Sequence, residues 1–376
     1  MKLASAGWTV LGFLGGLSGV ETPLAAQRDV GEADRPRARD LGIVIGSLPV
    51  GPRNAITDVA GVRVGHATVV RDKNVRTGVT VVLPHGGNVY RDKVPAAVYV
   101  GNGYGKLVGI TQVEELGELE SPVVLTNTLN VGKMMDAMVA HMLAIPGNER
   151  VRSINVVVGE TNDGGLNDIR GRHVSAEHLQ SALADASATD VREGCVGAGT
   201  GTICFGWKGG IGTASRRVDK TMVGVLVQTN FGGALTIKGV PIHERMNPSV
   251  GGKAPRKAKD DGSCMIIVAT DAPLRARNLS RLAQRALAGM ARTGASFSNG
   301  SGDYVIAFST AAAVRVNNPR PGPEVPNAKM TVLFKAVAEA SEEAIVNSLC
   351  RATSMTGSGR TVPAIPIARL KAIFAK

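Results

Sequence analysis

Short apolar runs alternate along the chain with longer segments in which apolar residues recur every three to four positions. The short runs are nearly continuous rather than strictly alternating, which is typical of strands buried on both faces of a sheet. They predict strands at Val79–Leu83, Ala97–Val100, Val123–Thr126, Ile154–Val158, Val223–Gln228, Met265–Thr270, Tyr304–Ser309 and Met330–Phe334.

The longer segments predict helices at Leu107–Leu119, Val131–Leu143, Ala176–Ala186, Leu274–Ala291 and Ala336–Cys350. In the last two, Arg and Glu lie on the face opposite the apolar residues, so one face of each helix can cover a sheet. The pattern therefore indicates a layered α+β or α/β domain, with helices on the outer faces of the sheets.

Glycine-rich segments and one long polar segment interrupt this alternation. Gly197-Ala198-Gly199-Thr200-Gly201-Thr202 lacks the Lys-Ser/Thr ending of a P-loop and the flanking strand and helix of a dinucleotide site. Close backbone packing explains it better than nucleotide binding. Met246–Asp261 has no periodicity and contains Pro, Gly and several basic residues, so it predicts a long exposed loop.

That loop ends at Gly262-Ser263, where the sequence changes abruptly to the apolar strand Met265–Thr270. Gly262 can adopt backbone conformations that other residues resist, so its carbonyl can be presented to a neighbouring hydroxyl. Cleavage of this bond would give Ser263 both a nucleophilic hydroxyl and a free α-amine. An ordinary transition from loop to strand also accounts for these residues when they are taken alone.

The first 26 residues differ from the rest of the chain. Lys2 precedes the apolar stretch Trp8 to Val20, and Leu24-Ala25-Ala26 forms a small-residue cleavage site, which together predict a secretory signal peptide at 1–26. No later segment has the roughly 18 apolar residues of a membrane span. We therefore expect an exported, periplasmic protein with no membrane association once the signal is removed, and a single domain at 27–376.

Composition limits the partners and cofactors that the chain can be expected to use. Although the formal net charge is +12, aromatic residues make up only 3% and the basic residues are scattered, so no nucleic-acid partner is expected. The four cysteines and six histidines match no metal motif, and we expect no metal and no organic cofactor. Free buried thiols are the simplest interpretation of the cysteines.

A carboxylate follows one of the predicted buried strands. Glu160 and Asp163 come directly after Ile154–Val158, where the end of a sheet provides a rigid platform beside a crevice. Either carboxylate could bind a ligand or simply cap a turn.

Several blocks together resemble the self-processing aminopeptidases of the L-aminopeptidase/D-esterase and β-peptidyl aminopeptidase family. The blocks cover residues 40–350 in family order, and they are Asn54 to His66, Thr77 to Thr80, Gly159 to Gly164, Lys208 to Arg216, Asp261 to Ser263, Val268 to Leu274, Ala291 to Gly294 and Asn299 to Asp303. The resemblance implies a four-layer αββα sandwich, similar to Ntn hydrolases but with its own topology. It also implies a homo-oligomer of processed large/small heterodimers.

The resemblance also implies a role for each site residue. Ser263 would attack the Gly262 carbonyl, giving a large subunit 27–262 and a small subunit 263–376, and would then act as nucleophile with its own α-amine as general base. Ser301 and Asp303 match the polar pair that supports the amine. Asn230 matches the oxyanion-hole donor, which is typically worth about 3–4 kcal/mol.

Glu160 is the candidate for binding the substrate's free amino group, and the expected substrates are small peptides or amino-acid amides and esters. Three alternatives stay open at this stage. Cys264 could replace Ser263 as nucleophile, since cysteine also serves as an N-terminal nucleophile. The chain could be an acyltransferase resembling the ornithine acetyltransferases, or a binding protein on the same scaffold that remains uncleaved.

Overall fold

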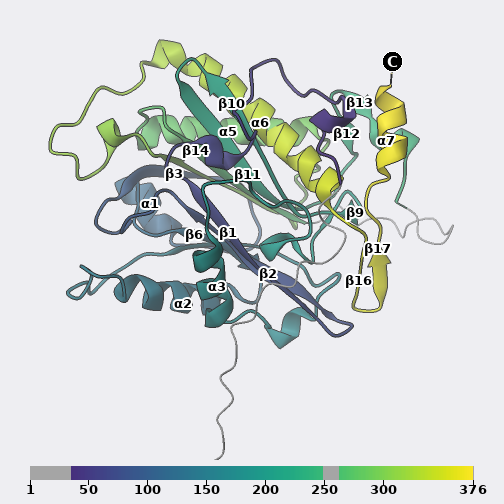
Figure 1. The fold of residues 1–376 in the computed structure, drawn as a ribbon, viewed down its shortest axis with the longest axis horizontal. Helices are drawn as coiled ribbons and strands as arrows, with labels where there is room; N and C mark the ends of the chain where they lie inside the picture. The colour runs from purple at the N-terminus through teal and green to yellow at the C-terminus, as the bar shows by residue number, and fades with distance from the viewer. Residues whose placement is uncertain (1–34, 249–261, 376) are drawn as a thin grey trace, which may run out of the picture. The chain divides into compact units, whose positions relative to one another are not determined.

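The structure, a computed structural model, describes residues 35–248 and 262–375 (Figure 1). The predicted signal peptide and most of the predicted loop Met246–Asp261 lie outside the described residues. Among the described residues, no helix is long and apolar enough to cross a membrane.

Two β-sheets form the centre of the fold. The first has the strand order β1 (Arg63–Arg71), β2 (Val75–Leu83), β6 (Val123–Asn127), β7 (Val157–Thr161) and β4 (Leu107–Val108). The second has the order β10 (Ile211–Val218), β11 (Thr221–Asn230), β14 (Ser263–Thr270), β15 (Gly302–Ser309), β3 (Val94–Gly103) and β5 (Glu118–Leu119). β6 runs parallel to β7 and β14 parallel to β15, and the other neighbours in these two sheets are antiparallel.

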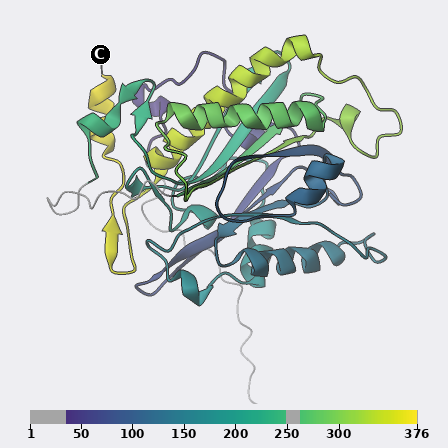
Figure 2. The same ribbon diagram turned by 180° about the vertical axis from the view of Figure 1, so that it is seen from behind.

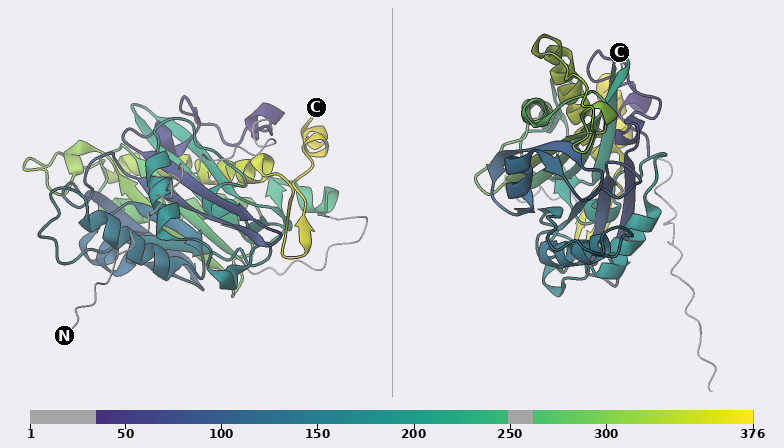
Figure 3. Two further views of the ribbon diagram at one scale, coloured as in Figure 1. Left: turned by 60° about the horizontal axis from the view of Figure 1, so that its bottom comes forward. Right: turned by 90° about the vertical axis from the view of Figure 1, so that its left-hand side faces the viewer.

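Two pairs of helices cover the outer faces of the sheets, as Figures 1 and 2 show. α2 (Val131–Leu143) and α3 (Ala176–Asp185) lie against the first sheet, and α5 (Ala276–Arg292) and α6 (Met330–Arg351) lie against the second. The turned views of Figure 3 show the same sequence of layers. The arrangement is a four-layer αββα sandwich, which confirms the fold predicted from the sequence.

Shorter elements complete the described part of the chain. The helices are α1 (Ile110–Leu116), α4 (Ile242–Arg245) and α7 (Ile367–Phe374). The strand pairs are β8 (Ile203–Cys204) with β9 (Trp207–Lys208), β12 (Thr236–Ile237) with β13 (Val240–Pro241), and β16 (Met355–Gly357) with β17 (Arg360–Val362).

Strand β14 is apolar at every position from Cys264 to Ala269, and its packing shows why. Cys264, Ile266 and Val268 pack into the core beneath α5 and α6, whereas Met265, Ile267 and Ala269 pack into the core between the sheets. Because successive side chains of a strand point to opposite faces, a strand in a central layer must be apolar on both. The expectation of strands buried on both faces is confirmed.

Three of the predicted elements are wrong in part or in whole. The predicted strand Ile154–Val158 begins only at Val157, because the Asn155 N–H donates to the Glu120 side chain, and it continues as β7 to Thr161, so Glu160 lies within the strand and not after it. Met330–Phe334 is not a strand but the first turns of α6, because the apolar run continues into a helix-forming segment that packs on β10 and β11. The predicted helix Leu107–Leu119 is helical only at α1, and its ends pair as β4 and β5. The glycine segment near Gly197 forms a buried 3-10 turn, where a Cβ on Gly201 would stand 2.9 Å from Asp163 Cβ, so close packing is confirmed there.

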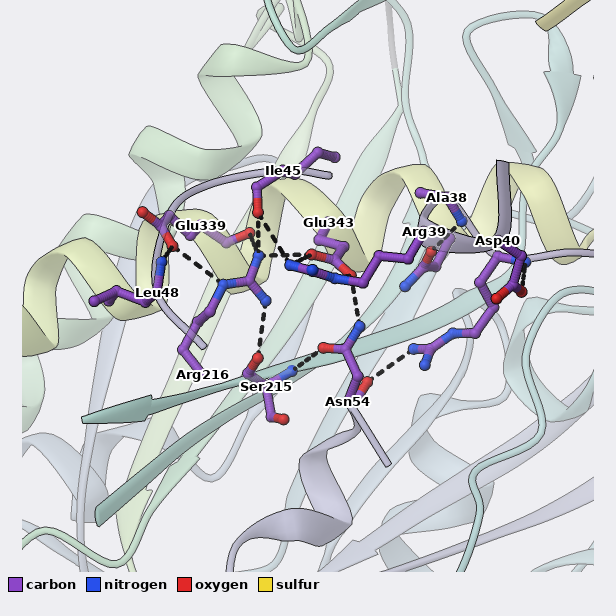
Figure 4. Close-up of polar contacts among 12 residues, drawn as sticks. Ala38, Arg39, Asp40, Ile45, Leu48, Asn54, Ser215, Arg216, Glu339 and Glu343 are labelled. Atoms are coloured by element: carbon purple, nitrogen blue, oxygen red, sulfur yellow. Dashed lines mark hydrogen bonds and ion pairs between the residues drawn. The ribbon is translucent and has the colours of Figure 1, made fainter. Parts of the chain in front are cut away.

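A buried ion network fastens the N-terminal segment to the inner face of α6 (Figure 4). Arg216 of β10 is fully buried and pairs with Glu339 at 3.1 Å and with Glu343 at 2.6 Å. Glu343 also accepts hydrogen bonds from Arg39, at 2.7 and 3.0 Å, and from Asn54. Glu339 accepts from the backbone N–H groups that follow Gly46. Each buried charge in the network therefore has an opposite charge and several hydrogen bonds.

Candidate active site

Ser263 is the first residue of β14 and lies in the middle of its sheet. It pairs with Asn230 across the antiparallel side and with Gly302 across the parallel side. By strand alternation its side chain lies on the same face as Met265, toward the space between the sheets.

Cys264 points the other way. It is fully buried beneath the helices, and burial, followed by the charge of Asp303, raises the pKa of its thiol well above the usual range. A thiol that stays protonated in the core is a poor nucleophile, so the geometry favours Ser263 over Cys264. All four cysteines are buried and none forms a disulfide.

One backbone donor serves both the carbonyl before Ser263 and the Ser263 hydroxyl. The Gly302 N–H donates to the Gly262 carbonyl oxygen at 3.1 Å and lies 3.3 Å from Ser263 Oγ. A Cβ on Gly262 would overlap the Asn230 carbonyl oxygen and stand 2.5 Å from Phe231 Cα. Only glycine fits at this position, because any side chain would push the Gly262 carbonyl away from its donor.

Asn230 sits beside Ser263 with its side-chain orientation fixed. Its Oδ1 accepts a hydrogen bond from the Ile203 N–H at 3.0 Å, which identifies the oxygen of the amide and leaves Nδ2 as a free donor among the described residues. The predicted oxyanion donor is therefore next to the predicted nucleophile in the sheet.

Asp303 follows Gly302 on β15 and pairs in register with Cys264. It is fully buried, and neither of its carboxylate oxygens makes a hydrogen bond of good geometry within the described part of the chain. Burial raises its pKa to about 6, and the nearby Ser301 hydroxyl and Cys264 N–H offset part of that rise. An ionised carboxylate in this position lacks the partner that buried charges normally have.

Ser301 is also buried, at the turn that leads into β15. Its carbonyl oxygen accepts hydrogen bonds from the Tyr104 N–H at 3.2 Å and from Asn102 Nδ2. These bonds fix the turn, so the Ser301 hydroxyl stays near the Asp303 carboxylate.

Glu160 lies on the facing sheet, at β7, and does not touch Ser263 directly. Its Oε1 accepts from the Lys106 N–H at 3.2 Å and lies 4.0 Å from Lys106 Nζ, while Oε2 accepts from the Thr128 hydroxyl. Burial raises the pKa of Glu160 against these opposing interactions. The two sheets are close here, since Met265 of β14 packs against Gly159 of β7.

Sequence reasoning missed two contributors to this site. Gly302 lies inside a motif that the resemblance includes, yet its N–H is visible as a donor only in the parallel pairing of β14 and β15. The sequence pattern predicts Tyr304 only as part of a strand. In the structure, its ring extends from the neighbourhood of Ser263 to that of Glu160. Within residues 35–248 and 262–375, no group of three or more His, Cys, Asp or Glu side chains could hold a metal ion.

The assembled residues can support acyl transfer on a serine. The site combines the Ser263 hydroxyl, a backbone donor on the neighbouring carbonyl, the free amide donor of Asn230 on the adjacent strand, and a buried carboxylate on the next strand. These are groups that nucleophilic catalysis uses.

Comparison with known proteins gives the same family throughout. The family model "Peptidase family S58" matches residues 54–362. β-Peptidyl aminopeptidase BapA of Sphingosinicella microcystinivorans is 43% identical, over 92% of this chain and 93% of that protein. A β-aminopeptidase structure from Burkholderia sp. is 43% identical, covers 89% of this chain and 97% of its own, and has a TM-score of 0.81.

The structure of L-aminopeptidase D-Ala-esterase/amidase from Ochrobactrum anthropi is described as a prototype for the serine aminopeptidases and a new variant of the Ntn hydrolase fold. It is 37% identical, covers 90% of this chain and 98% of its own, and has a TM-score of 0.82. These findings confirm the resemblance seen in the sequence and the assignment to N-terminal-nucleophile hydrolases. The chain belongs to peptidase family S58.

Proposed function

We propose that this chain is an exported serine aminopeptidase that activates itself by cutting the Gly262–Ser263 bond. The observation that carries the proposal is the shared donor: the Gly302 N–H holds the Gly262 carbonyl at 3.1 Å and lies 3.3 Å from Ser263 Oγ. A hydroxyl held next to a polarised carbonyl is positioned for attack on it. The export signal at 1–26 lies outside the described residues and stays a prediction.

Self-cleavage would proceed by an N-to-O acyl shift. Ser263 Oγ bonds to the Gly262 carbonyl carbon, the bond from that carbon to the Ser263 nitrogen breaks, and the nitrogen takes up the hydroxyl proton. Water then hydrolyses the ester, which releases the Gly262 carboxylate and leaves Ser263 as an N-terminus. The new α-ammonium would form on the strand beside Asp303, one residue along from its register partner Cys264, and it would give the uncut chain's unpaired carboxylate a cation in its neighbourhood.

The same groups would then turn over substrate. The α-amine, whose ordinary pKa is about 7.7–8.0, accepts the Oγ proton as Ser263 attacks the substrate carbonyl. Asn230 Nδ2 and the Gly302 N–H stabilise the oxyanion, the departing amine or alcohol takes the proton, and water hydrolyses the acyl-enzyme. Glu160 binds the free ammonium of the substrate, which restricts cleavage to the first residue.

A free amino group on the substrate is the feature shared by the relatives' names, since they are an L-aminopeptidase and β-peptidyl aminopeptidases. We therefore assign small peptides, amino-acid amides and esters as substrates, processed without metal or organic cofactor. Assembly of the cleaved heterodimers into a homo-oligomer remains a prediction from the family.

The test compares wild type, Ser263→Ala and the control Ser280→Ala, which lies on α5 away from the site. Each is assayed with an amino-acid anilide and with its N-acetylated analogue. We expect Ser263→Ala to lose at least about 10³-fold in kcat/KM, since the nucleophile is gone, and Ser280→Ala to match wild type. Wild type should reject the N-acetylated anilide. Wild-type rates in Ser263→Ala, or equal rates on both substrates, would overturn the proposal.

A further inference from the structure

Tyr304 connects the two halves of the candidate site. A Cβ on Gly302 would stand 3.0 Å from Tyr304 Cε2 and 3.3 Å from Ser263 Oγ, so the edge of the ring lies beside the nucleophile. A Cβ on Gly105 would stand 2.8 Å from Glu160 Oε1 and 3.6 Å from the Tyr304 hydroxyl. The phenol therefore runs from the serine toward the carboxylate on the facing sheet.

The Tyr304 hydroxyl makes no hydrogen bond to another described residue. The residue is 4% exposed, and its oxygen is not among the enclosed polar atoms that lack a partner in the described chain. The oxygen is therefore accessible and has its acceptor capacity free for a ligand.

The charges around the hydroxyl indicate the sign of that ligand. Burial raises the pKa of Tyr304, and the negative charges of Glu160 and Asp303 raise it further. The phenol accordingly stays neutral at physiological pH. Its hydroxyl faces the Glu160 carboxylate across the two sheets, and the cation near that carboxylate, Lys106, stands 4.0 Å away on an exposed side chain. A group that donates hydrogen bonds to both oxygens fits this point better than an anion.

Glu160 has limited capacity to bind a cation alone. Lys106 and Thr128 already donate to its two oxygens. An ammonium ion carries three N–H donors and is poorly satisfied by one partly occupied carboxylate.

We propose that the Tyr304 hydroxyl oxygen is a second acceptor for the substrate's ammonium group, beside Glu160; this rests on the proposed aminopeptidase function. The ammonium donates one hydrogen bond to Glu160 and another to Tyr304, and the carbon chain continues along the ring to Ser263. Tyr304 thus helps set how far the amine stands from the scissile carbonyl, and so how many carbons separate the two.

The test uses Tyr304→Phe, which keeps the ring and removes the hydroxyl. Its control is Tyr99→Phe, because the Tyr99 hydroxyl bonds to Gln284 of α5 and not to the site. Each processed enzyme is assayed on an amino-acid anilide and on the matching anilide that lacks the amine. We expect Tyr304→Phe to lower kcat/KM for the amino substrate about tenfold to a hundredfold, mainly through KM, and to leave the deamino substrate unchanged.

A purely structural role for Tyr304 would lower kcat/KM on both substrates together. That result would overturn the inference, and so would an unchanged kcat/KM on both. Glu160→Gln, measured in the same series, separates this inference from the proposed function. If Glu160→Gln loses its preference for the amino substrate while Tyr304→Phe keeps it, only the role of Tyr304 is wrong. If Glu160→Gln keeps the preference as well, the amine site itself is wrong.

Discussion

Two regions of this molecule bury carboxylates in opposite ways. On the inner face of α6, Glu343 is fully buried and accepts from Arg216, Arg39 and Asn54. At the start of β15, Asp303 is equally buried and its two oxygens lack hydrogen bonds within the described chain. Burial raises the pKa of Asp303 to about 6. The buried charges that support the fold are thus paired within the uncut chain, whereas Asp303 has no charge partner there. Cleavage at Ser263 would create a cation near it.

The largest effect on stability is expected from breaking the paired region. Glu343→Gln leaves Arg216 with one carboxylate instead of two and should lower the free energy of unfolding by about 3–5 kcal/mol. The free energy of unfolding is measured by chemical denaturation, with every variant made in a Ser263→Ala background so that the chain stays uncut. Glu244→Gln, an exposed residue, is the control and should change stability by less than about 0.5 kcal/mol. A loss below 1 kcal/mol for Glu343→Gln would show that the network is not structural.

The unpaired region should give a smaller effect with the opposite sign at neutral pH. In the folded chain the Asp303 pKa lies near 6, above its ordinary 3.8. The contribution of the protonated Asp303 carboxyl to the free energy of unfolding is therefore full below about pH 4 and is lost as pH rises through 6. Raising a carboxyl pKa by this amount corresponds to roughly 3 kcal/mol at pH 8. Asp303→Asn in the Ser263→Ala background should therefore gain stability relative to Asp303 between pH 4 and 8. Denaturation at a series of pH values measures this, and a pH-independent difference would contradict it.

The smallest effects should come from the outer members of the paired region. Arg39→Met removes a half-exposed partner of Glu343, which keeps Arg216, and should cost about 1–2 kcal/mol. Lys335→Met removes the long pair, at 3.9 Å, between an exposed lysine and the buried Glu339, which keeps Arg216, and should cost less than about 0.5 kcal/mol. Neither should alter kcat/KM on an amino-acid anilide. A fall in activity without a fall in stability would show that the two regions are coupled.

The sequence was sufficient where burial comes from apolar side chains. β11, β14 and β15 are apolar on both faces, and their predicted ranges fall within the observed strands. β1 and β10 were missed because they carry buried polar residues such as His66 and Arg216. Arg216 is buried only because Glu339 and Glu343 come to it from more than 120 residues away, and no local pattern contains that information.

The residues of the candidate site also fall into those that the sequence predicted and those that only the structure reveals. Ser263, Asn230 and Asp303 could be named from motifs, and the register of β11, β14 and β15 brings them together. Gly302 contributes through its backbone N–H and Tyr304 through an unpartnered hydroxyl. Neither feature depends on residue type alone, since each arises from how two strands or two sheets face one another.

The most direct test of the account is the N-terminal sequence of the small fragment in the purified, denatured protein. The account predicts two chains, with the smaller one beginning Ser-Cys-Met-Ile-Ile, which corresponds to Ser263 onward. A single uncut chain in active protein, or a fragment that begins at any other residue, would contradict it.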